Sequence, residues 1–189
     1  MKTALITGGA ARIGAQIVKT LHLDQFNIII HCNQSKDKAQ LLCDELNSIR
    51  ANSVEVISGN LNNIDELDSL VNSIKSIDLL VNNASVFYPK SVEDSEMQDW
   101  DDVININLKA PFFLSKGLSK TLSENDGSII NIIDIHSERP LKKHAIYNIS
   151  KAGLKMLTQT LAKELAPRIR VNGVSPGSIL WPQDSAEIS

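Results

Sequence analysis

A pair of residues near position 150 has the types and the spacing that proton-transfer chemistry requires. Tyr147 and Lys151 are four residues apart in the stretch HAIYNISK, so a helix there would place both side chains on one face. A tyrosine with a pKa near ~10 is a poor acid–base group at neutral pH. A nearby ammonium group favours the phenolate and lowers that pKa. The pair therefore predicts a catalytic tyrosine whose acidity is tuned by a lysine.

An acidic residue, Asp134, precedes Tyr147 by thirteen positions. An ionised carboxylate only accepts hydrogen bonds, and it would repel a carbonyl oxygen that gains negative charge during reduction. It suits a nitrogen-rich substrate instead, because it can accept N–H bonds or share protons with a C=N bond. Asp134 therefore favours the reduction of a nitrogen heterocycle. The alternative is that it only caps free N–H groups at the end of a strand.

A glycine-rich loop, TGGAARIG at positions 7–14, follows an apolar run and precedes an amphipathic segment. Its glycines allow a tight turn and a close approach of the backbone, and the start of a helix presents free N–H groups to a pyrophosphate. The loop therefore predicts a dinucleotide site at the head of a βαβ unit. The alternative is an ordinary turn between a strand and a helix.

The choice between the two nicotinamide cofactors depends on the end of the second predicted strand. A site that prefers NAD usually has an acid there, which bonds the ribose 2′-hydroxyl. This chain has Asn33, Gln34 and Ser35 at that place, and no acid before Asp37. Arg12 could meet a 2′-phosphate with its guanidinium group. The pattern favours NADPH, unless Arg12 is only a solvated residue at the helix start.

The elements that must position these residues follow from hydrophobic patterning. Short apolar runs alternate with longer amphipathic segments, which indicates a parallel sheet covered by helices. The predicted strands are Thr3–Thr7, Asn27–His31, Val54–Ser58, Leu79–Asn82, Ser128–Asp134 and Arg170–Ser175. The predicted helices are Ile13–Leu23, Lys36–Ala51, Ile64–Lys75, Met97–Leu122 and Ala145–Ala166. We expect an α/β fold of the Rossmann type, in which residues 1–189 form one domain with a doubly wound parallel sheet in the strand order 3-2-1-4-5-6.

Composition narrows the classes of function and of partner. The 189 residues suffice for one domain with a hydrophobic core. A formal net charge of −3 argues against nucleic acid or an anionic membrane as the main partner. Cys32 and Cys43 make no disulfide framework, and the N-terminus lacks the apolar stretch of a signal peptide. We expect a cytoplasmic protein with no membrane-spanning segment and no metal site.

Four motifs together resemble those of the short-chain dehydrogenase/reductase family, in the family's order and over essentially the whole chain. They are TGGAARIG, Asn82-Asn83-Ala84, Asn107 in INLKAPFFL, and YNISK. The resemblance implies a single Rossmann domain, hydride transfer with a nicotinamide cofactor, and a homotetramer or homodimer. It also implies that Asn107 anchors a proton-relay water. Asn105 is the nearby competitor, with a poorer spacing to Pro111.

By matching positions, the resemblance implies a set of cofactor-binding residues. It comprises Gly8, Arg12, Ile13, Gly14, Asn33, Gln34, Ser35, Asn60, Leu61, Asn83, Ala84, Ser85, Tyr147, Lys151, Pro176 and Gly177. Asn60 replaces the aspartate with which the family usually contacts adenine, and its amide oxygen can still accept a hydrogen bond. Lys151 is expected to donate to the cofactor ribose as well as to tune Tyr147.

Within the family, the chain resembles the pteridine reductases. Most members have a serine at the position of Asp134, where it bonds the substrate carbonyl oxygen, whereas pteridine reductases use an Asp–Tyr–Lys set. The stretch NASVFYP is similar to their NAS-x-FYP segment, whose serine contacts pterin and cofactor and whose phenylalanine stacks on the pterin. The resemblance implies substrate contacts from Ser85, Phe87, Asp134 and Tyr147, although Phe87 by itself could be a core aromatic. The stretch SILWP at 178–182 is similar to bacterial dihydromonapterin/dihydrofolate reductases.

The expected function is NADPH-dependent reduction of dihydropterins (dihydrobiopterin or dihydromonapterin), and of dihydrofolate, to the tetrahydro form. An alternative within the family is a general carbonyl or 3-oxoacyl reductase. A third hypothesis is a nucleotide-binding protein without catalysis. It arises because the chain ends soon after the sixth predicted strand, at ILWPQDSAEIS, with no room for the family's further strand and substrate lid.

Overall fold

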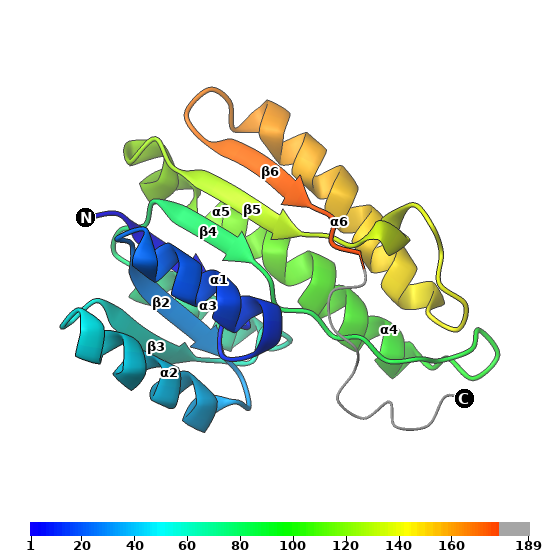
Figure 1. The fold of residues 1–189 in the computed structure, drawn as a ribbon. Coiled ribbons are helices and arrows are strands. Elements are labelled where there is room, and N and C mark those ends of the chain that lie inside the picture. Colours follow the sequence, from blue (N-terminus) through cyan, green and yellow to red (C-terminus); the bar gives the residue numbers. More distant parts are fainter. Residues whose placement is uncertain (178–189) are drawn as a thin grey trace.

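The computed structural model describes residues 1–177 and contains one sheet of six parallel strands in the order β3-β2-β1-β4-β5-β6. Figure 1 shows this sheet with helices on both of its faces. The order confirms the predicted doubly wound topology, in which the winding direction reverses between β1 and β4. Ligands of such sheets bind at this switch point, outside the carboxyl ends of the strands.

The elements have the following bounds. The strands are β1 (Thr3–Ile6), β2 (Asn27–Cys32), β3 (Val54–Ser58), β4 (Leu79–Asn82), β5 (Ser128–Ile132) and β6 (Arg170–Val174). The helices are α1 (Arg12–Leu23), α2 (Lys36–Ile49), α3 (Ile64–Ser73), α4 (Met97–Ile104), the π-helix η1 (Asn105–Lys109), α5 (Ala110–Glu124), the 3-10 helix η2 (Ile135–Ser137) and α6 (Ala145–Glu164). The predicted strands are confirmed. Asp134, however, lies beyond the end of β5 and is the N-cap of η2.

Burial on both faces of the sheet fixes the positions of the strand ends. In β2, Ile28 and Ile30 belong to a core cluster with residues of α1 and α2, whereas Ile29 faces a second cluster with residues of α3, α5 and α6. Strands buried on both faces are apolar without alternation, which is why they were recognisable in the sequence. Because each strand is held on two sides, the loops at its carboxyl end have fixed positions.

The structure corrects the prediction of a single helix over Met97–Leu122, because this segment consists of three parts. The helix α4 ends at Ile104, η1 spans Asn105–Lys109, and α5 begins at Ala110. A π-helix closes its hydrogen bonds over one more residue than an α-helix does, and such turns often occur at functional sites. This one contains Asn107.

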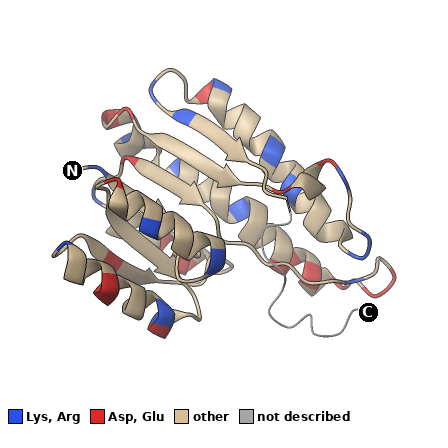
Figure 2. Ribbon diagram, viewed as in Figure 1, with Lys and Arg blue, Asp and Glu red and all other residues tan. Residues whose placement is uncertain are grey.

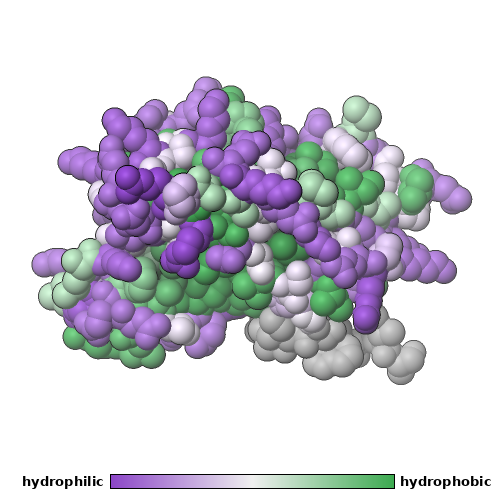
Figure 3. All heavy atoms as spheres, turned by 90° about the horizontal axis from the view of Figure 1, so that it is seen from above, coloured by the Kyte–Doolittle hydropathy of each residue, from purple (hydrophilic) through white to green (hydrophobic). Residues whose placement is uncertain are grey.

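One face of the sheet carries an apolar groove within the described residues. The helices α1 and α2 lie over β1, β2 and β3, and beside α1 the strands β4, β5 and β6 border a groove of about 620 Å3. Its lining includes Ile17, Val81, Ile130, Ile132 and Val174. The space-filling view in Figure 3 shows apolar surface between hydrophilic side chains on the face that it draws.

Charged residues are distributed without a strong bias in sign. Figure 2 shows Lys and Arg interspersed with Asp and Glu along the helices, while the strands are mostly uncharged. This agrees with the small net charge of −3. Among residues 1–177, none of the helices combines the length and the apolar character needed to cross a membrane.

Candidate active site

Two glycines allow the glycine-rich loop to pack tightly at the switch point. Gly8 has a φ of +62°, in the left-handed region that glycine tolerates best. A Cβ on Gly14, in the first turn of α1, would lie 2.2 Å from the Gly8 carbonyl oxygen and 2.7 Å from Asn83 Nδ2. The start of α1 can therefore approach the segment that follows β4 only because position 14 has no side chain.

We expect Gly14→Ala to lower the free energy of unfolding by about 1–3 kcal/mol, the usual cost of overpacking. The added methyl group would push the loop away from the Asn83 side chain. Urea denaturation measures the change. Gly59→Ala is the matched control, because a Cβ there meets its nearest neighbour at 3.9 Å. Equal losses in the two variants would contradict this explanation.

Thr7 and Asn83 hold the loop in place. Thr7 Oγ1 accepts hydrogen bonds from the backbone N–H groups of Asn83 and Ala84, both at 3.0 Å. The Asn83 side chain donates to the carbonyl oxygens of Thr7, at 2.8 Å, and of Gly8, at 3.1 Å. Both N–H bonds of the Asn83 side chain are therefore used to fix the loop. Its backbone and Ala84 still face the loop.

His31 is a functional candidate that sequence patterns did not single out. Its buried ring lies between the glycine-rich loop and the turn after β3. The Gly8 N–H donates to Nδ1 at 3.4 Å, and Nε2 lies 3.0 Å from the Gly59 carbonyl oxygen. Burial lowers the pKa of His31, so the ring is neutral and Nε2–H is the donor to Gly59. The only signal in the sequence was one polar residue inside an apolar strand.

A cleft of about 450 Å3 lies at the carboxyl ends of the first three strands. Five of the predicted cofactor residues line it: Gly8, Asn33, Gln34, Ser35 and Asn60. The lining also includes Asn62, Tyr88 and Asp102, which were not predicted. Asn62 Nδ2 donates to Asp102 Oδ1 at 2.8 Å, so this acid is already paired with a donor.

Four predicted cofactor residues lie elsewhere. Arg12, Ile13 and Pro176 line the apolar groove beside α1, and Leu61 packs in the hydrophobic core. Arg12 has a φ of +51°, and its exposed side chain is on the groove side of the loop. Arg12 therefore does not line the cleft that contains Asn33, Gln34 and Ser35. Gly177 is the last described residue, and a Cβ there would have no neighbour within 4 Å.

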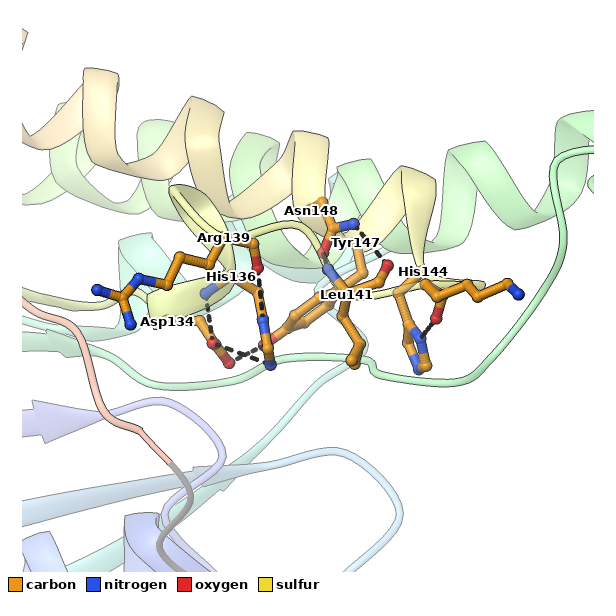
Figure 4. A network of polar contacts seen from close by, with 8 residues as sticks. Asp134, His136, Arg139, Leu141, His144, Tyr147 and Asn148 are labelled. Carbon is orange, nitrogen blue, oxygen red and sulfur yellow. Dashed lines mark hydrogen bonds and ion pairs between the residues drawn. The ribbon is translucent and has the colours of Figure 1, made fainter.

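The predicted catalytic residues Tyr147 and Asp134 are in direct contact. The Tyr147 hydroxyl donates to Asp134 Oδ2 at 2.7 Å, and the backbone N–H of His136 donates to Oδ1 at 2.9 Å. Figure 4 shows the Tyr147 side chain extending from α6 to the carboxylate of Asp134. Asp134 thus caps a backbone N–H group, as one interpretation of the sequence held, and also meets the tyrosine, as the other required.

The structure reverses the predicted effect on the acidity of Tyr147. Burial raises the pKa of Tyr147, and the hydrogen bond to Asp134 and the charge of that carboxylate raise it further. Lys151 Nζ lies 5.6 Å from the centroid of the Tyr147 ring. The raised pKa of Tyr147 is opposite to the lowering by this ammonium group that the sequence predicted. Tyr147 is a neutral phenol, which is the form that donates a proton.

Lys151 is buried beside this pair, with 2% of its surface exposed. Its Nζ donates to the Ile132 carbonyl oxygen at 3.0 Å. Burial lowers the pKa of Lys151 to about 8, and the charge of Asp134 acts against this with a smaller effect. An ammonium group has three N–H bonds, so two remain for other acceptors.

Asn107 is buried in the π-helix and clamps two segments together. Its Oδ1 accepts from the Val86 N–H at 2.8 Å, and its Nδ2 donates to the Val86 carbonyl oxygen at 3.0 Å and to Ser150 Oγ at 3.1 Å. Both N–H bonds of the amide are used, so the side chain has none left for a relay water. Asn105 instead donates to Asn62 Oδ1 at 2.7 Å, under the cleft. Ser150, which was not predicted, completes the clamp.

Phe87 stands beside the tyrosine and is 52% exposed, so it is no core aromatic. Its ring meets the edge of Tyr147 with centroids 4.8 Å apart. It also stacks on His144 at 4.5 Å with an interplanar angle of 18°, so one ring face is already occupied. Ser85 is exposed in the same segment. Sequence patterns did not single out His144, because its contact with Phe87 joins distant parts of the chain.

These features define a class of protein: an α/β nucleotide-binding fold with a glycine-rich loop at its switch point and a buried tyrosine–lysine pair nearby. A profile described as short chain dehydrogenase matches residues 2–187. The chain belongs to the short chain dehydrogenase family.

Individual relatives differ in the activity that their names state. Pteridine reductase 1 of Leishmania tarentolae is 33% identical over 96% of this chain and 78% of its own length. The 3-oxoacyl-[acyl-carrier-protein] reductase FabG of Staphylococcus epidermidis is 36% identical over 98% of this chain and 78% of its own. The crystal structure of FolM alternative dihydrofolate reductase 1 from Brucella suis, in complex with NADP, superimposes with a TM-score of 0.88 at 38% identity, over 95% of this chain and 76% of that one. The similarity expected at 178–182 lies outside the described residues.

Proposed function

We propose that this chain is an NADPH-dependent pteridine reductase that reduces dihydropterins, and dihydrofolate as a second substrate, to the tetrahydro form. One observation carries the proposal: the 2.7 Å hydrogen bond from the Tyr147 hydroxyl to the Asp134 carboxylate. A carboxylate at this place accepts N–H bonds from a heterocycle and does not stabilise the oxyanion of a ketone. The names of the Leishmania and Brucella relatives support the same reaction.

The proposed roles divide between proton transfer and orientation of the substrate. Tyr147 donates the proton to the nitrogen of the C=N bond, and Asp134 accepts N–H groups of the pterin. Lys151 donates its free N–H bonds to the cofactor ribose. The exposed face of Phe87 stacks on the pterin, a flat ring that gains from such contact. Ser85 contacts the pterin and the cofactor from the same segment.

Asn107 is proposed as a positioning residue rather than as the anchor of a water. Its three hydrogen bonds join the segment that carries Ser85 and Phe87 to α6, which carries Tyr147. It therefore sets the distance between the stacking ring and the proton donor.

The cleft at the ends of the first three strands fits NADPH. Because Gly14 has no Cβ, the start of α1 can lie close to the glycine-rich loop, where its N–H groups can meet a pyrophosphate. The uncharged side chains of Asn33, Gln34 and Ser35 offer hydrogen-bond donors to a 2′-phosphate and do not repel it. NADPH bound there would supply the hydride. The other proposed contacts are Gly8 and Asn60, which line the cleft, and Ala84, Lys151 and Gly177. Arg12, Ile13 and Pro176, which line the groove, are proposed to contact the cofactor from that side.

We expect Asn33→Asp to raise the KM for NADPH by about tenfold or more and to lower the ratio of activity with NADPH to activity with NADH. The new carboxylate would repel the 2′-phosphate and could bond the 2′-hydroxyl of NADH. Steady-state kinetics with both cofactors measures the shift. Asn72→Asp, which adds the same charge to an exposed position of α3, is the control. The same shift in both variants would rule out a local effect.

The function is tested by the oxidation of NADPH with dihydrobiopterin, dihydromonapterin and dihydrofolate, with NADH as the cofactor control. We expect turnover of at least one pterin or folate with NADPH. A folded protein that turns over none of them would contradict the proposal. If calorimetry then shows that NADPH binds, the hypothesis of a nucleotide-binding protein without catalysis is favoured.

A general carbonyl or 3-oxoacyl reductase is the second candidate, and the identity of 36% to a 3-oxoacyl reductase favours it. It predicts turnover of a 3-oxoacyl thioester by the wild-type protein and a gain of that activity in Asp134→Ser, since a hydroxyl donates to a developing oxyanion. A pteridine reductase should lose pterin turnover in the same variant.

We further propose a homo-oligomer, one domain and a cytoplasmic location. The exposed apolar side chains Phe112 on α5, and Ile149 and Met156 on α6, support an interface between copies on these helices. Light scattering at several protein concentrations tests the oligomer, and a mass of one chain throughout would contradict it.

The free, buried thiols of Cys32 and Cys43 support a reducing compartment.

A further inference from the structure

The contact between Tyr147 and Asp134 creates a need for a second proton source. Reduction of a C=N bond requires a hydride at carbon and a proton at nitrogen. When Tyr147 has given up its proton, a phenolate would face the Asp134 carboxylate across a contact of 2.7 Å. Two negative charges at this distance repel strongly in a partly buried site. A proton must therefore reach the pair in each turnover.

The side chain of His136 lies beside the Asp134 oxygen that does not bond Tyr147. Its Nε2 lies 4.0 Å from Asp134 Oδ1, the oxygen that does not bond Tyr147. Its Nδ1 lies 2.8 Å from the Arg139 carbonyl oxygen, which can only accept, so Nδ1 carries a hydrogen. Nε2 is the other ring nitrogen, and it is turned toward the carboxylate.

Exposure separates the roles within this cluster. Tyr147 and Lys151 are 6% and 2% exposed, whereas the side chains of His136 and Asp134 are 25% and 23% exposed. Figure 4 shows the His136 ring and the Tyr147 hydroxyl on the same side of the Asp134 carboxylate, with a contact from each to that carboxylate. A proton from water can therefore reach His136 and Asp134 more readily than it can reach Tyr147. Imidazole is the side chain best suited to exchange protons near neutral pH.

We propose that His136 relays a proton from solvent to Asp134, and through it to Tyr147, in each catalytic cycle. The inference rests on the proposed reduction of a C=N bond. Tyr147 gives its hydroxyl proton to the ring nitrogen as the hydride reaches the adjacent carbon. Protonated His136 passes the Nε2 proton to Asp134, and the carboxyl group rotates and passes it to the Tyr147 phenolate. Neutral His136 then takes a proton from water, so each turnover consumes one hydride and one proton.

A small movement is enough to bring His136 Nε2 and Asp134 Oδ1 into contact for the transfer of the proton. The 4.0 Å between Nε2 and Oδ1 exceeds a normal hydrogen bond by roughly 1 Å. A rotation of the imidazole ring or one bridging water closes this gap. The backbone N–H of His136 stays on Asp134 Oδ1 at 2.9 Å in any variant that keeps the main chain, so a change of side chain does not remove the cap.

The test compares His136→Gln and His136→Ala with the wild-type protein, using NADPH and dihydrofolate. We expect His136→Gln to lower kcat by about tenfold or more, with little change in the KM for NADPH, and to raise the solvent deuterium isotope effect on kcat. Added imidazole should restore turnover to His136→Ala but not to Tyr147→Phe. A purely structural role for His136 would not respond to imidazole.

Glu138→Gln is the matched control, because it changes a charge in the same turn and breaks only the ion pair with Lys155. It should keep the wild-type isotope effect. If the His136 variants have the wild-type kcat and isotope effect, or if imidazole restores nothing, the relay is overturned while the proposed function stands. If the wild-type protein turns over no pterin or folate, the proposed function fails and the relay fails with it.

Discussion

Asp134→Ala is expected to lower kcat for dihydrofolate by about 100-fold or more while the affinity for NADPH changes little. Asp134 is the acceptor of the Tyr147 hydroxyl and, in the proposed function, of the pterin N–H groups. Alanine removes both contacts, yet it is far from the cleft residues Asn33 and Gln34 that would hold the cofactor. Steady-state kinetics and NADPH titration by calorimetry measure the two effects separately. A parallel loss of cofactor binding would point to a collapse of the site.

The same residue controls the acidity of Tyr147, so a second variant gives an independent readout. Asp134→Asn keeps the size of the side chain and an oxygen that can accept the hydroxyl, but it carries no charge. We expect the pKa of Tyr147 to fall relative to the wild type and to stay above its ordinary value, because burial is the largest cause of its elevation. Ultraviolet titration of phenolate follows this change. The chain has two tyrosines, so Tyr147→Phe identifies the signal of Tyr88. An unchanged titration would contradict the assigned cause.

Lys151→Met should lower the catalytic efficiency strongly and yet leave the folded protein at least as stable as the wild type at pH 7. Burial lowers the pKa of Lys151 from its ordinary 10.5 to about 8. A shift of this size corresponds to about 3 kcal/mol of stability lost by keeping the ammonium group buried. Methionine fills a similar volume without that cost. Because Lys151 is proposed to bind the ribose, we expect kcat/KM to fall by about 100-fold or more.

The dependence of stability on pH distinguishes this cause from simple repacking. A lysine whose pKa is lowered in the folded state binds fewer protons when folded than when unfolded between about pH 8 and pH 10.5. The free energy of unfolding of the wild type should therefore gain a rising contribution across this window and none below it. Lys151→Met should lack that contribution, as urea denaturation at several pH values would reveal. Lys155→Met, on an exposed face of α6, is the control. Parallel pH profiles of the wild type and Lys151→Met would refute the buried charge.

The fold was predictable because its determinants are local. A strand such as Ile28–Ile30 is apolar on both faces, and each amphipathic segment has a helical period, so run lengths alone give the order of elements. The residues of the Asp134–Tyr147 pair were predictable for a similar reason. The two positions are thirteen residues apart in the sequence, and only η2, one loop and the first turn of α6 lie between them. Their ionisation was not predictable, because it depends on burial and on which partner the hydroxyl selects.

The residues that escaped prediction act through contacts between distant parts of the chain. His31 joins Gly8 to Gly59, and Ser150 meets Asn107 across two helices. Neither has a sequence motif, since a histidine in a strand or a serine in a helix has many ordinary explanations. The direction of the Arg12 side chain depends on a left-handed backbone, which a motif does not state. Side-chain direction and tertiary hydrogen bonds are therefore what the structure adds.

The π-helix η1 sets an angular offset between the helices that it joins. In a continuous α-helix each residue advances by about 100°, so the apolar stripe of α4 would dictate where the stripe of α5 points. The wide turn at Asn105–Lys109 resets that angle, and α4 can pack on α6 while Leu114 and Leu118 of α5 enter the core beneath the sheet. Removing one residue from η1 would leave both helices intact and rotate one buried stripe toward water. An insertion or deletion in η1 is therefore tolerated only if it preserves the angle between the buried faces of α4 and α5, and the length of the segment matters less.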